Sequence, residues 1–323
     1  MPRAGVRGGV TTVHHVVSRV CGQSFLLTDE EKEAFRGLLR RVAGFCGVEV
    51  ITYALLDNHF HLLVEVPGSV GELSDEELLG RARLLYGKER KGQPLSMARI
   101  EGALRSGGEG RGAMRGLLMG RMAALPMFMK ILKQRYSILF NRKYDRVGTL
   151  WEGRFRSVLV EDTRLAVRAV AAYIDLNAVR AGIVRDPKDY RFSGYGESVG
   201  GGRLTSYAVW RRIADNRADP PEVVAARYRQ YLFLIGSDPR KGGTVSADDA
   251  MNVKAQGGRL SGVQQLRCRV RYMTCGAIIG SKAFVQKWMC ERRGGSTGGA
   301  RTSGPVPAAG FGDEGLYSAS KRA

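Results

Sequence analysis

The sequence predicts an α+β fold in which an antiparallel sheet is flanked by helices. Three segments at residues 11–20, 48–56 and 59–66 have the β-branched or alternating apolar pattern of strands. A segment with helical periodicity separates the first strand from the second. Only two polar residues, Asp57 and Asn58, separate the last two strands, which indicates an antiparallel hairpin.

The first strand and first helix are predicted from local pattern. TTVHHVVSRV at residues 11–20 is rich in β-branched residues, as strands are. Thr28 and Glu31 then have the spacing of a capping box, and apolar residues recur at helical intervals to about residue 45. We therefore expect a strand followed by a helix.

The two hairpin strands complete the predicted strand, helix, strand, strand unit. VEVITYALL covers residues 48–56, and HFHLLVEV covers residues 59–66. We expect the second of these strands to be central in the sheet, with the helices on one of its faces.

The middle of the chain is predicted to be helical with an insertion. Helical fragments at residues 76–125 are interrupted by GKERKGQP and RSGGEGRG, which indicates a loosely ordered insertion. A helix is expected at about residues 126–144. A second helix is expected at residues 162–182, with Asp162 as its N-cap and Gly182 at its C′ position.

The remainder of the chain predicts a small, mainly helical region. Composition shifts after about residue 200, and helical stretches near 221–235 and 277–290 suggest a region of unknown role at 199–293. TCGAIIGSKAFVQKW within it fits a helix-turn-helix piece or a packing appendage equally well. The tail at 294–323, rich in Gly, Ser, Pro and Ala, is expected to be disordered.

Composition points to a soluble protein with an acidic partner. The 323 residues include 51 Lys and Arg against 31 Asp and Glu, a formal net charge of +20. No apolar run reaches the length of a membrane span, and MPRAGVRGG lacks the apolar core of a signal peptide, so a cytoplasmic location is expected. The five cysteines show no CxxC spacing, which argues against a disulfide framework and a cysteine zinc site.

All four histidines lie in two short segments, His14-His15 and His59-Phe60-His61. Because side chains alternate along a strand, His59 and His61 point to the same face and can converge on one ion. An isolated pair with this spacing is more often a chance polar face of a half-exposed strand.

A tyrosine and an amide follow in the predicted 162–182 helix. Tyr173 and Asn177 are four residues apart, so they lie on one helix face. A lone tyrosine in an amphipathic helix usually packs in the core.

The segment at residues 133–156 combines basic and aromatic residues, the mixture that neutralises phosphates and stacks unpaired bases. For each candidate the alternative is a surface charge or a core aromatic. The candidate DNA contacts are Lys133, Arg135, Arg142, Trp151, Arg154 and Arg156.

Four segments in order resemble the single-tyrosine HUH transposases, in particular the REP-associated tyrosine transposases. They are HHVVSR, LLDNHFHLLVEVP, GTLWEGRFRS and YIDLNAVRAGIVRDPKDYRFSGY, and the similarity covers roughly residues 8–196. The resemblance therefore implies a catalytic domain at residues 1–198 that includes the 76–125 insertion.

The resemblance also implies a site and a reaction. His59 and His61 match the histidines that hold a divalent cation, Mg²⁺ or Mn²⁺, and Asn177 matches a third ligand. Tyr173 matches the nucleophile that forms a 5′-phosphotyrosine link, whereas Ala178 stands where the family usually has proline. The implied partner is single-stranded DNA next to hairpins, and the protein is expected to be a monomer or homodimer.

Two other functions fit part of the pattern. A domesticated protein of this fold could bind single strands without cleaving them, although both histidines and the tyrosine are present. A ribosomal type of RNA-binding protein would explain the charge, but not the HxH pair together with the Tyr-x-x-x-Asn helix.

Overall fold

The structure is a computed structural model in which two compact units can be described separately, Met1–Ile174 and Asp175–Ala323. The division falls inside a helix, whereas the sequence predicted a domain boundary at residue 198, which stays a prediction. The described residues are 9–23, 26–87, 95–202, 212–214, 219–237, 245–260, 279–280, 286, 306–307 and 317–318.

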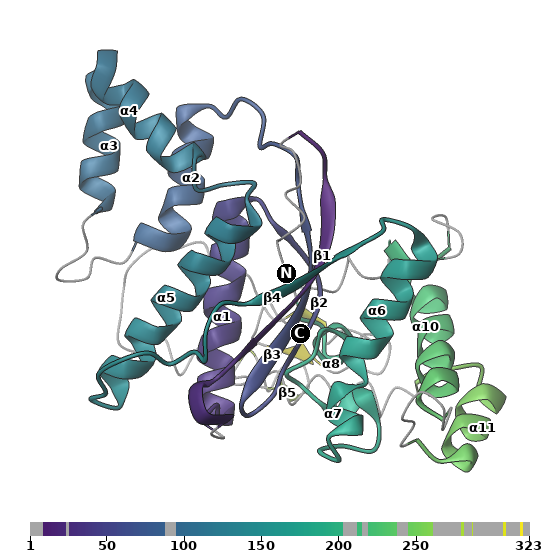
Figure 1. The fold of residues 1–323 in the computed structure, drawn as a ribbon. Coiled ribbons are helices and arrows are strands. Elements are labelled where there is room, and N and C mark those ends of the chain that lie inside the picture. Colours follow the sequence, from purple (N-terminus) through teal and green to yellow (C-terminus); the bar gives the residue numbers. More distant parts are fainter. Residues whose placement is uncertain are drawn as a thin grey trace. The chain divides into compact units, whose positions relative to one another are not determined.

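The first unit is built on a four-stranded antiparallel sheet with the order β2-β3-β1-β4 (Figure 1). The sheet is flanked by helices, which confirms the predicted α+β class, and β3 is an inner strand as expected. The strands are β1 (Thr12–Arg19), β2 (Glu49–Leu55), β3 (His59–Val66) and β4 (Arg156–Val160).

The predicted hairpin between β2 and β3 is present, and an ion pair joins its turn to a helix. The backbone N–H of Leu56 donates to the carbonyl of His59 at 2.8 Å, which leaves Asp57 and Asn58 as the two turn residues. The ammonium of Lys32, a buried residue of helix α1 (Asp29–Cys46), lies 2.5 Å from the carboxylate of Asp57. The turn that precedes His59 is therefore tied to α1.

Helices α1 and α5 (Leu125–Lys143) lie on one side of the sheet (Figure 1), and aromatic side chains join them to it. The ring of Phe60 in β3 lies 4.8 Å from that of Phe35 in α1, between ring centroids. Phe35 in turn lies 4.9 Å from Tyr136 of α5. This is the main core of the first unit.

The opposite face of the sheet is also approached by a helix, so the expectation of helices on one face is wrong. His61 follows Phe60 and therefore points to the other face, where its ring lies 6.0 Å from Tyr173 of α6 (Arg164–Asp175). This face includes the fully buried side chains of Val13 and Leu63, which also need cover from water.

The region expected to be a loose insertion contains three helices, so that expectation is wrong where the structure describes it. Helix α2 begins with a full capping box made by Ser74 and Glu77, and Asp75 accepts bonds from Arg111 and Arg115 of α4. Glycine and charge interrupt the apolar periodicity without removing the caps and buried residues that these helices need. The helices are α2 (Asp75–Tyr86), α3 (Met97–Ser106) and α4 (Gly108–Met119).

The helix expected at residues 162–182 is divided at Leu176 into α6 and the short α7 (Asn177–Arg180). Its N-cap is Thr163 rather than Asp162, because the Thr163 hydroxyl accepts from the N–H of Ala166 at 3.4 Å. The single continuous helix was therefore wrong, and Tyr173 and Asn177 lie on different helices.

The predicted glycine at the C-terminal end is confirmed. Gly182 has a φ of +69°, and its N–H donates to the carbonyl of Val179 at 2.9 Å. The N–H of Ile183 donates to the carbonyl of Ala178 at 2.9 Å. The two bonds form a Schellman motif, in which the left-handed conformation favours glycine.

The second unit is mainly helical in its described part. The helix expected near 221–235 is confirmed as α10, whereas the helix expected at 277–290, the helix-turn-helix segment and most of the tail lie outside the described residues. Three two-residue strands pair in the order β5-β7-β6. The elements are η2 (Pro187–Asp189), α8 (Gly194–Val199), α10 (Pro221–Gly236), α11 (Ala247–Ala255), β5 (Ile279–Gly280), β6 (Val306–Pro307) and β7 (Tyr317–Ser318).

The described residues contain neither a membrane-spanning helix nor a disulfide. Among them, none of the helices is both long enough and apolar enough to cross a membrane. Cys21 and Cys46, the cysteines that the structure describes, are free thiols, and burial raises the pKa of Cys46 to about 12.

Candidate active site

Three histidines and one tyrosine of the first unit gather on the sheet face opposite α1. His59 and His61 come from β3, His15 comes from β1, and Tyr173 comes from α6. The His61 ring lies 5.0 Å from that of His59 and 5.2 Å from that of His15, between centroids. The structure thus brings together three of the predicted site residues and adds His15.

The hydrogen bonds of the histidine pair leave the same nitrogen of each ring for a ligand. Nδ1 of His59 lies 2.6 Å from Oδ1 of Asn58, and Nδ1 of His61 lies 3.0 Å from Nε2 of His15. Metal-binding histidines typically have their second nitrogen held by a neighbour in this way. Nε2 of His59 and Nε2 of His61 are therefore the candidate ligand atoms.

The surroundings keep these imidazoles neutral. Burial lowers the pKa of His61 to about 3, with smaller contributions from the nearby His59, His15 and Arg19. Burial also lowers the pKa of His59, with Arg19 adding to the effect, and burial lowers that of His15. At neutral pH each ring therefore keeps one nitrogen lone pair, as a metal ligand must.

Tyr173 lies beside this group with its side chain open to solvent. Its ring meets those of His15 and His61 edge-on, at centroid distances of 5.9 and 6.0 Å. The side chain is 44% exposed. Part of this side chain can therefore be reached from solvent.

The histidine pair fits a divalent cation only as part of a larger ligand set. Two neutral imidazoles suit a transition or divalent metal that completes its shell with oxygen ligands. Among the described residues, no group of three or more His, Cys, Asp and Glu side chains is placed to hold a metal ion. Asn177, the expected third ligand, begins α7 in the second unit, and its role stays a prediction.

Two exposed arginines share the histidine face of the sheet. Arg19 of β1 is paired with His59 of β3. Val17 of β1 is paired with His61 of β3 on one side and with Arg156 of β4 on the other. Residues paired across an antiparallel sheet point to the same face. Arg156 was predicted as a phosphate contact, whereas Arg19 was missed, although its place in the first strand gives it the same parity as His15.

The side chains of three other predicted DNA contacts donate hydrogen bonds to backbone carbonyls of the protein itself. Trp151 is 5% exposed and donates from Nε1 to the carbonyl of Lys133 at 3.1 Å, so the stacking role predicted for it is wrong. Lys133 donates to the carbonyl of Gly153 at 2.7 Å, and burial lowers its pKa to about 8. Arg135 donates to the carbonyl of Leu85 at 3.1 Å. The mixture of basic and aromatic residues at 133–156 therefore reflects, at Trp151, packing in the core.

The remaining predicted contacts, Arg142 and Arg154, are exposed. Arg142 lies in the last turn of α5, and Arg154 lies two residues before β4. Their contact with DNA stays a prediction.

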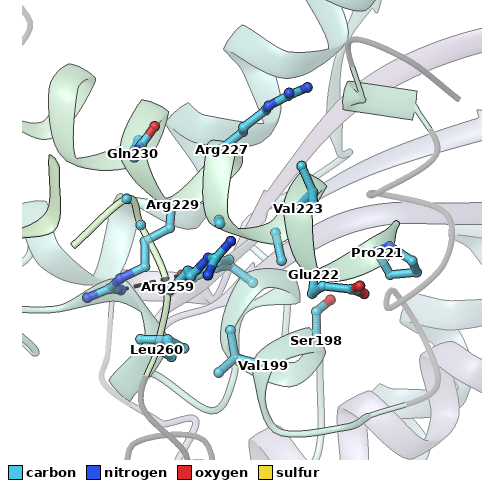
Figure 2. Close-up of a pocket in the computed structure, with 15 residues that line it drawn as sticks. Ser198, Val199, Pro221, Glu222, Val223, Arg227, Arg229, Gln230, Arg259 and Leu260 are labelled. Carbon is cyan, nitrogen blue, oxygen red and sulfur yellow. Dashed lines mark hydrogen bonds between the residues drawn. The ribbon is translucent and has the colours of Figure 1, made fainter. Parts of the chain in front are cut away.

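The second unit has a cavity of about 820 Å³ between α8, α10 and residues 257–260 (Figure 2). Two of its arginines are already paired, Arg229 with Asp186 at 2.6 Å and Arg227 with Asp219. Arg259 and Glu222 also line the cavity, so with two arginines paired the charges of the cavity nearly balance, and it has no clear preference for an anion.

Comparisons with known proteins give distant structural likenesses only. No protein-family model matches the chain, and no curated protein matches it. The chain is similar to a solved structure of a REP-associated tyrosine transposase bound to a REP hairpin, with 16% identity and a TM-score of 0.38, over 68% of this chain and 93% of that one. Likeness at this level identifies neither family nor activity, so the site is judged from its own side chains.

Proposed function

We propose that the protein is a divalent-metal-dependent transposase or endonuclease that cleaves and rejoins single-stranded DNA near hairpins, with Tyr173 as the nucleophile. The observation that carries the proposal is the position of Tyr173 beside a neutral histidine pair whose Nδ1 atoms are both held. A net charge of +20 and the exposed Arg19 and Arg156 on the same sheet face favour a phosphate-bearing substrate.

The residues present suit a transesterification. The Tyr173 oxygen attacks the phosphorus, the bond from phosphorus to the 3′ oxygen breaks, and a 5′-phosphotyrosine link forms. The phenol loses its proton to water, and the released 3′ oxygen takes one from water. Mg²⁺ or Mn²⁺, when held by His59, His61 and an oxygen ligand such as Asn177, would supply Lewis-acid polarisation of the phosphate.

Each other residue has one task in this reaction. Arg19 and Arg156 would hold the strand through its phosphates. Because the phosphotyrosine link keeps the energy of the phosphodiester bond, a 3′ hydroxyl of another strand can displace Tyr173 without ATP. The same site therefore serves cleavage and rejoining.

Replacement of the nucleophile tests the proposal directly. The protein is incubated with single-stranded DNA that contains hairpins and with Mg²⁺ or Mn²⁺, and a denaturing gel reports covalent adducts. Tyr173→Phe is expected to abolish the adduct and to leave DNA binding nearly unchanged, because only one oxygen is removed. Tyr144→Phe is the comparison for loss of another exposed tyrosine hydroxyl, since Tyr144 is also 44% exposed. Its hydroxyl donates to Glu31 at 2.7 Å, so the stability of this variant is measured alongside.

The outcomes separate the candidate functions. Adduct formation that survives Tyr173→Phe would move the nucleophile to another residue. Tyr136 is a poor substitute, because it is 1% exposed and burial raises its pKa. Binding without an adduct in the wild type would instead support the non-cleaving single-strand binder.

The metal requirement is tested on the histidines. His59→Ala and His61→Ala are each expected to abolish cleavage, and chelation is expected to do so reversibly, with rescue by Mg²⁺ or Mn²⁺. Asn177→Ala should be milder, because water can replace one neutral oxygen ligand. Cleavage that continues at full rate in excess chelator would contradict the metal-dependent mechanism.

A further inference from the structure

We propose that His15 is a positioning residue that holds His61 in its Nδ1–H tautomer, so that the Nε2 lone pair of His61 faces the candidate ligand site. The hydrogen bond between the two rings is a property of the chain alone. Only the identity of the ligand, a divalent cation, rests on the proposed function.

The sheet register explains how the two rings meet. His15 is paired with Leu63 and His61 is paired with Val17, so His15 and His61 are diagonal neighbours on one face. Diagonal neighbours are within reach of each other when their side chains are long or aromatic. Nε2 of His15 lies 3.0 Å from Nδ1 of His61, and the rings are stacked with an interplanar angle of 18°.

Only one direction of this hydrogen bond leaves His61 able to bind a cation. A hydrogen bond between two ring nitrogens needs one donor and one acceptor, and a neutral imidazole has one nitrogen of each kind. If His15 donated, the proton of His61 would have to lie on Nε2, and no lone pair would remain there. If His61 donates from Nδ1 to Nε2 of His15, its own Nε2 keeps the lone pair.

Nε2 of His59, the other candidate ligand atom, is left unprotonated by a similar hydrogen bond. Nδ1 of His59 faces Oδ1 of Asn58, an atom that only accepts, so the proton of His59 lies on Nδ1. With His15 as the acceptor for His61, both histidines present Nε2 in its unprotonated form. His15 also touches the ring of Tyr173, so one side chain contacts both a candidate ligand and the candidate nucleophile.

Nuclear magnetic resonance of the metal-free and DNA-free protein tests the tautomer. The chain has four histidines, so selective ¹⁵N labelling gives few signals, and long-range ¹H–¹⁵N correlations identify the protonated nitrogen of each ring. The wild type is expected to show His61 protonated at Nδ1. His61 protonated at Nε2 would overturn the proposal, and this result needs no variant.

Two substitutions separate the hydrogen bond from packing. His15→Phe keeps a ring and removes both nitrogens, so the tautomer preference of His61 should be lost. His15→Gln places an amide oxygen where it can accept from His61, and it should restore the preference. His14→Phe is the matched control, because His14 points to the opposite face and bonds Thr12 at 3.0 Å.

Titration with Mn²⁺, followed by electron paramagnetic resonance, measures the consequence. His15→Phe is expected to raise the Kd for Mn²⁺ by roughly 10–100-fold, the usual effect of losing such a partner. His15→Gln should stay near the wild type, and so should His14→Phe. An unchanged Kd in His15→Phe would overturn the proposal even if the tautomer were as expected.

The two proposals can fail separately. If the tautomer and the Mn²⁺ affinities behave as expected but no phosphotyrosine adduct forms, the proposed function is wrong and the positioning role stands. If the adduct forms and His15→Phe changes neither readout, the positioning role is wrong.

Discussion

At the scale of single residues, burial sets the chemistry of the imidazoles. His61 is 6% exposed, and its surroundings disfavour the imidazolium, so the pKa falls to about 3. A cation therefore does not have to displace a proton from the ring at neutral pH. The neighbouring Tyr173, by contrast, is 44% exposed, which is compatible with the nucleophilic role proposed for it.

Trp151 provides the first stability prediction at this scale. Its ring lies 5.4 Å from Phe60 and 5.9 Å from Tyr136, between centroids, inside the main core. Trp151→Ala is therefore expected to lower the free energy of unfolding by about 3–5 kcal/mol, as large-to-small core substitutions do. Urea denaturation measures this, with Trp151→Phe as the milder comparison.

A different outcome would restore the role first expected of this residue. If Trp151→Ala left stability unchanged but weakened binding of single-stranded DNA at every salt concentration, the ring would have to be a stacking platform. Its side-chain donor, bonded to the carbonyl of Lys133, argues for the core.

Strand alternation was enough to predict part of this site, but not all of it. It places His59 and His61 on one face from sequence alone. The contact with His15 depends on the register between β1 and β3, which no local pattern contains. The burial of Trp151 likewise depends on residues of α1, β3 and α5, so composition could not separate a core aromatic from a stacking one.

At the scale of elements, a buried carboxylate joins α1 to α5. Glu31 of α1 is 3% exposed and accepts bonds from Lys143 at 2.5 Å and Tyr144 at 2.7 Å. Burial pushes its pKa up, but these bonds outweigh burial, and the pKa lies below the ordinary value of 4.5. Its contribution to stability is therefore present above pH 4.5 and is lost as pH falls through the lowered pKa.

Glu31→Gln tests this link between helices. The substitution is expected to lower the free energy of unfolding at neutral pH by about 1–3 kcal/mol, because it weakens charged hydrogen bonds. It should also flatten the fall in stability between about pH 5 and pH 3. Denaturation across this range measures both effects, and Glu109→Gln, at an exposed position of α4, is the control. Equal effects of the two substitutions would contradict the link.

The division of the predicted helix at Leu176 could not be predicted from the sequence. The apolar period continues from residue 164 to 180, so the sequence predicts one helix. In the structure α6 ends at Asp175, whose buried carboxylate accepts from the Tyr195 N–H at 3.1 Å and from the Tyr228 hydroxyl at 2.7 Å. These partners lie 20 and 53 residues along the chain from Asp175, so no local pattern contains them.

At the scale of the whole molecule, the net charge of +20 predicts steep salt dependence of DNA binding. Each phosphate neutralised on a single strand contributes about −0.7 to the slope of log K against log salt. Removal of residues 294–323 should change binding little, because the segment has three basic and two acidic residues. Loss of binding on this deletion would place the main DNA contacts in the tail.

The location of the charge, rather than its total, distinguishes a DNA path beside Tyr173 from general attraction. Arg156 lies on the histidine face of the sheet and Arg154 precedes it, so reversing both to Glu should make the slope less steep by about 1.4, two phosphate contacts at about 0.7 each. Arg83→Glu with Arg105→Glu changes the net charge equally, on helices α2 and α3, at side chains that are 61% and 80% exposed. This control should weaken binding slightly and keep the slope. Measured across about 50 to 200 mM salt, equal slopes for the two double variants would mean that the strand does not pass along β4.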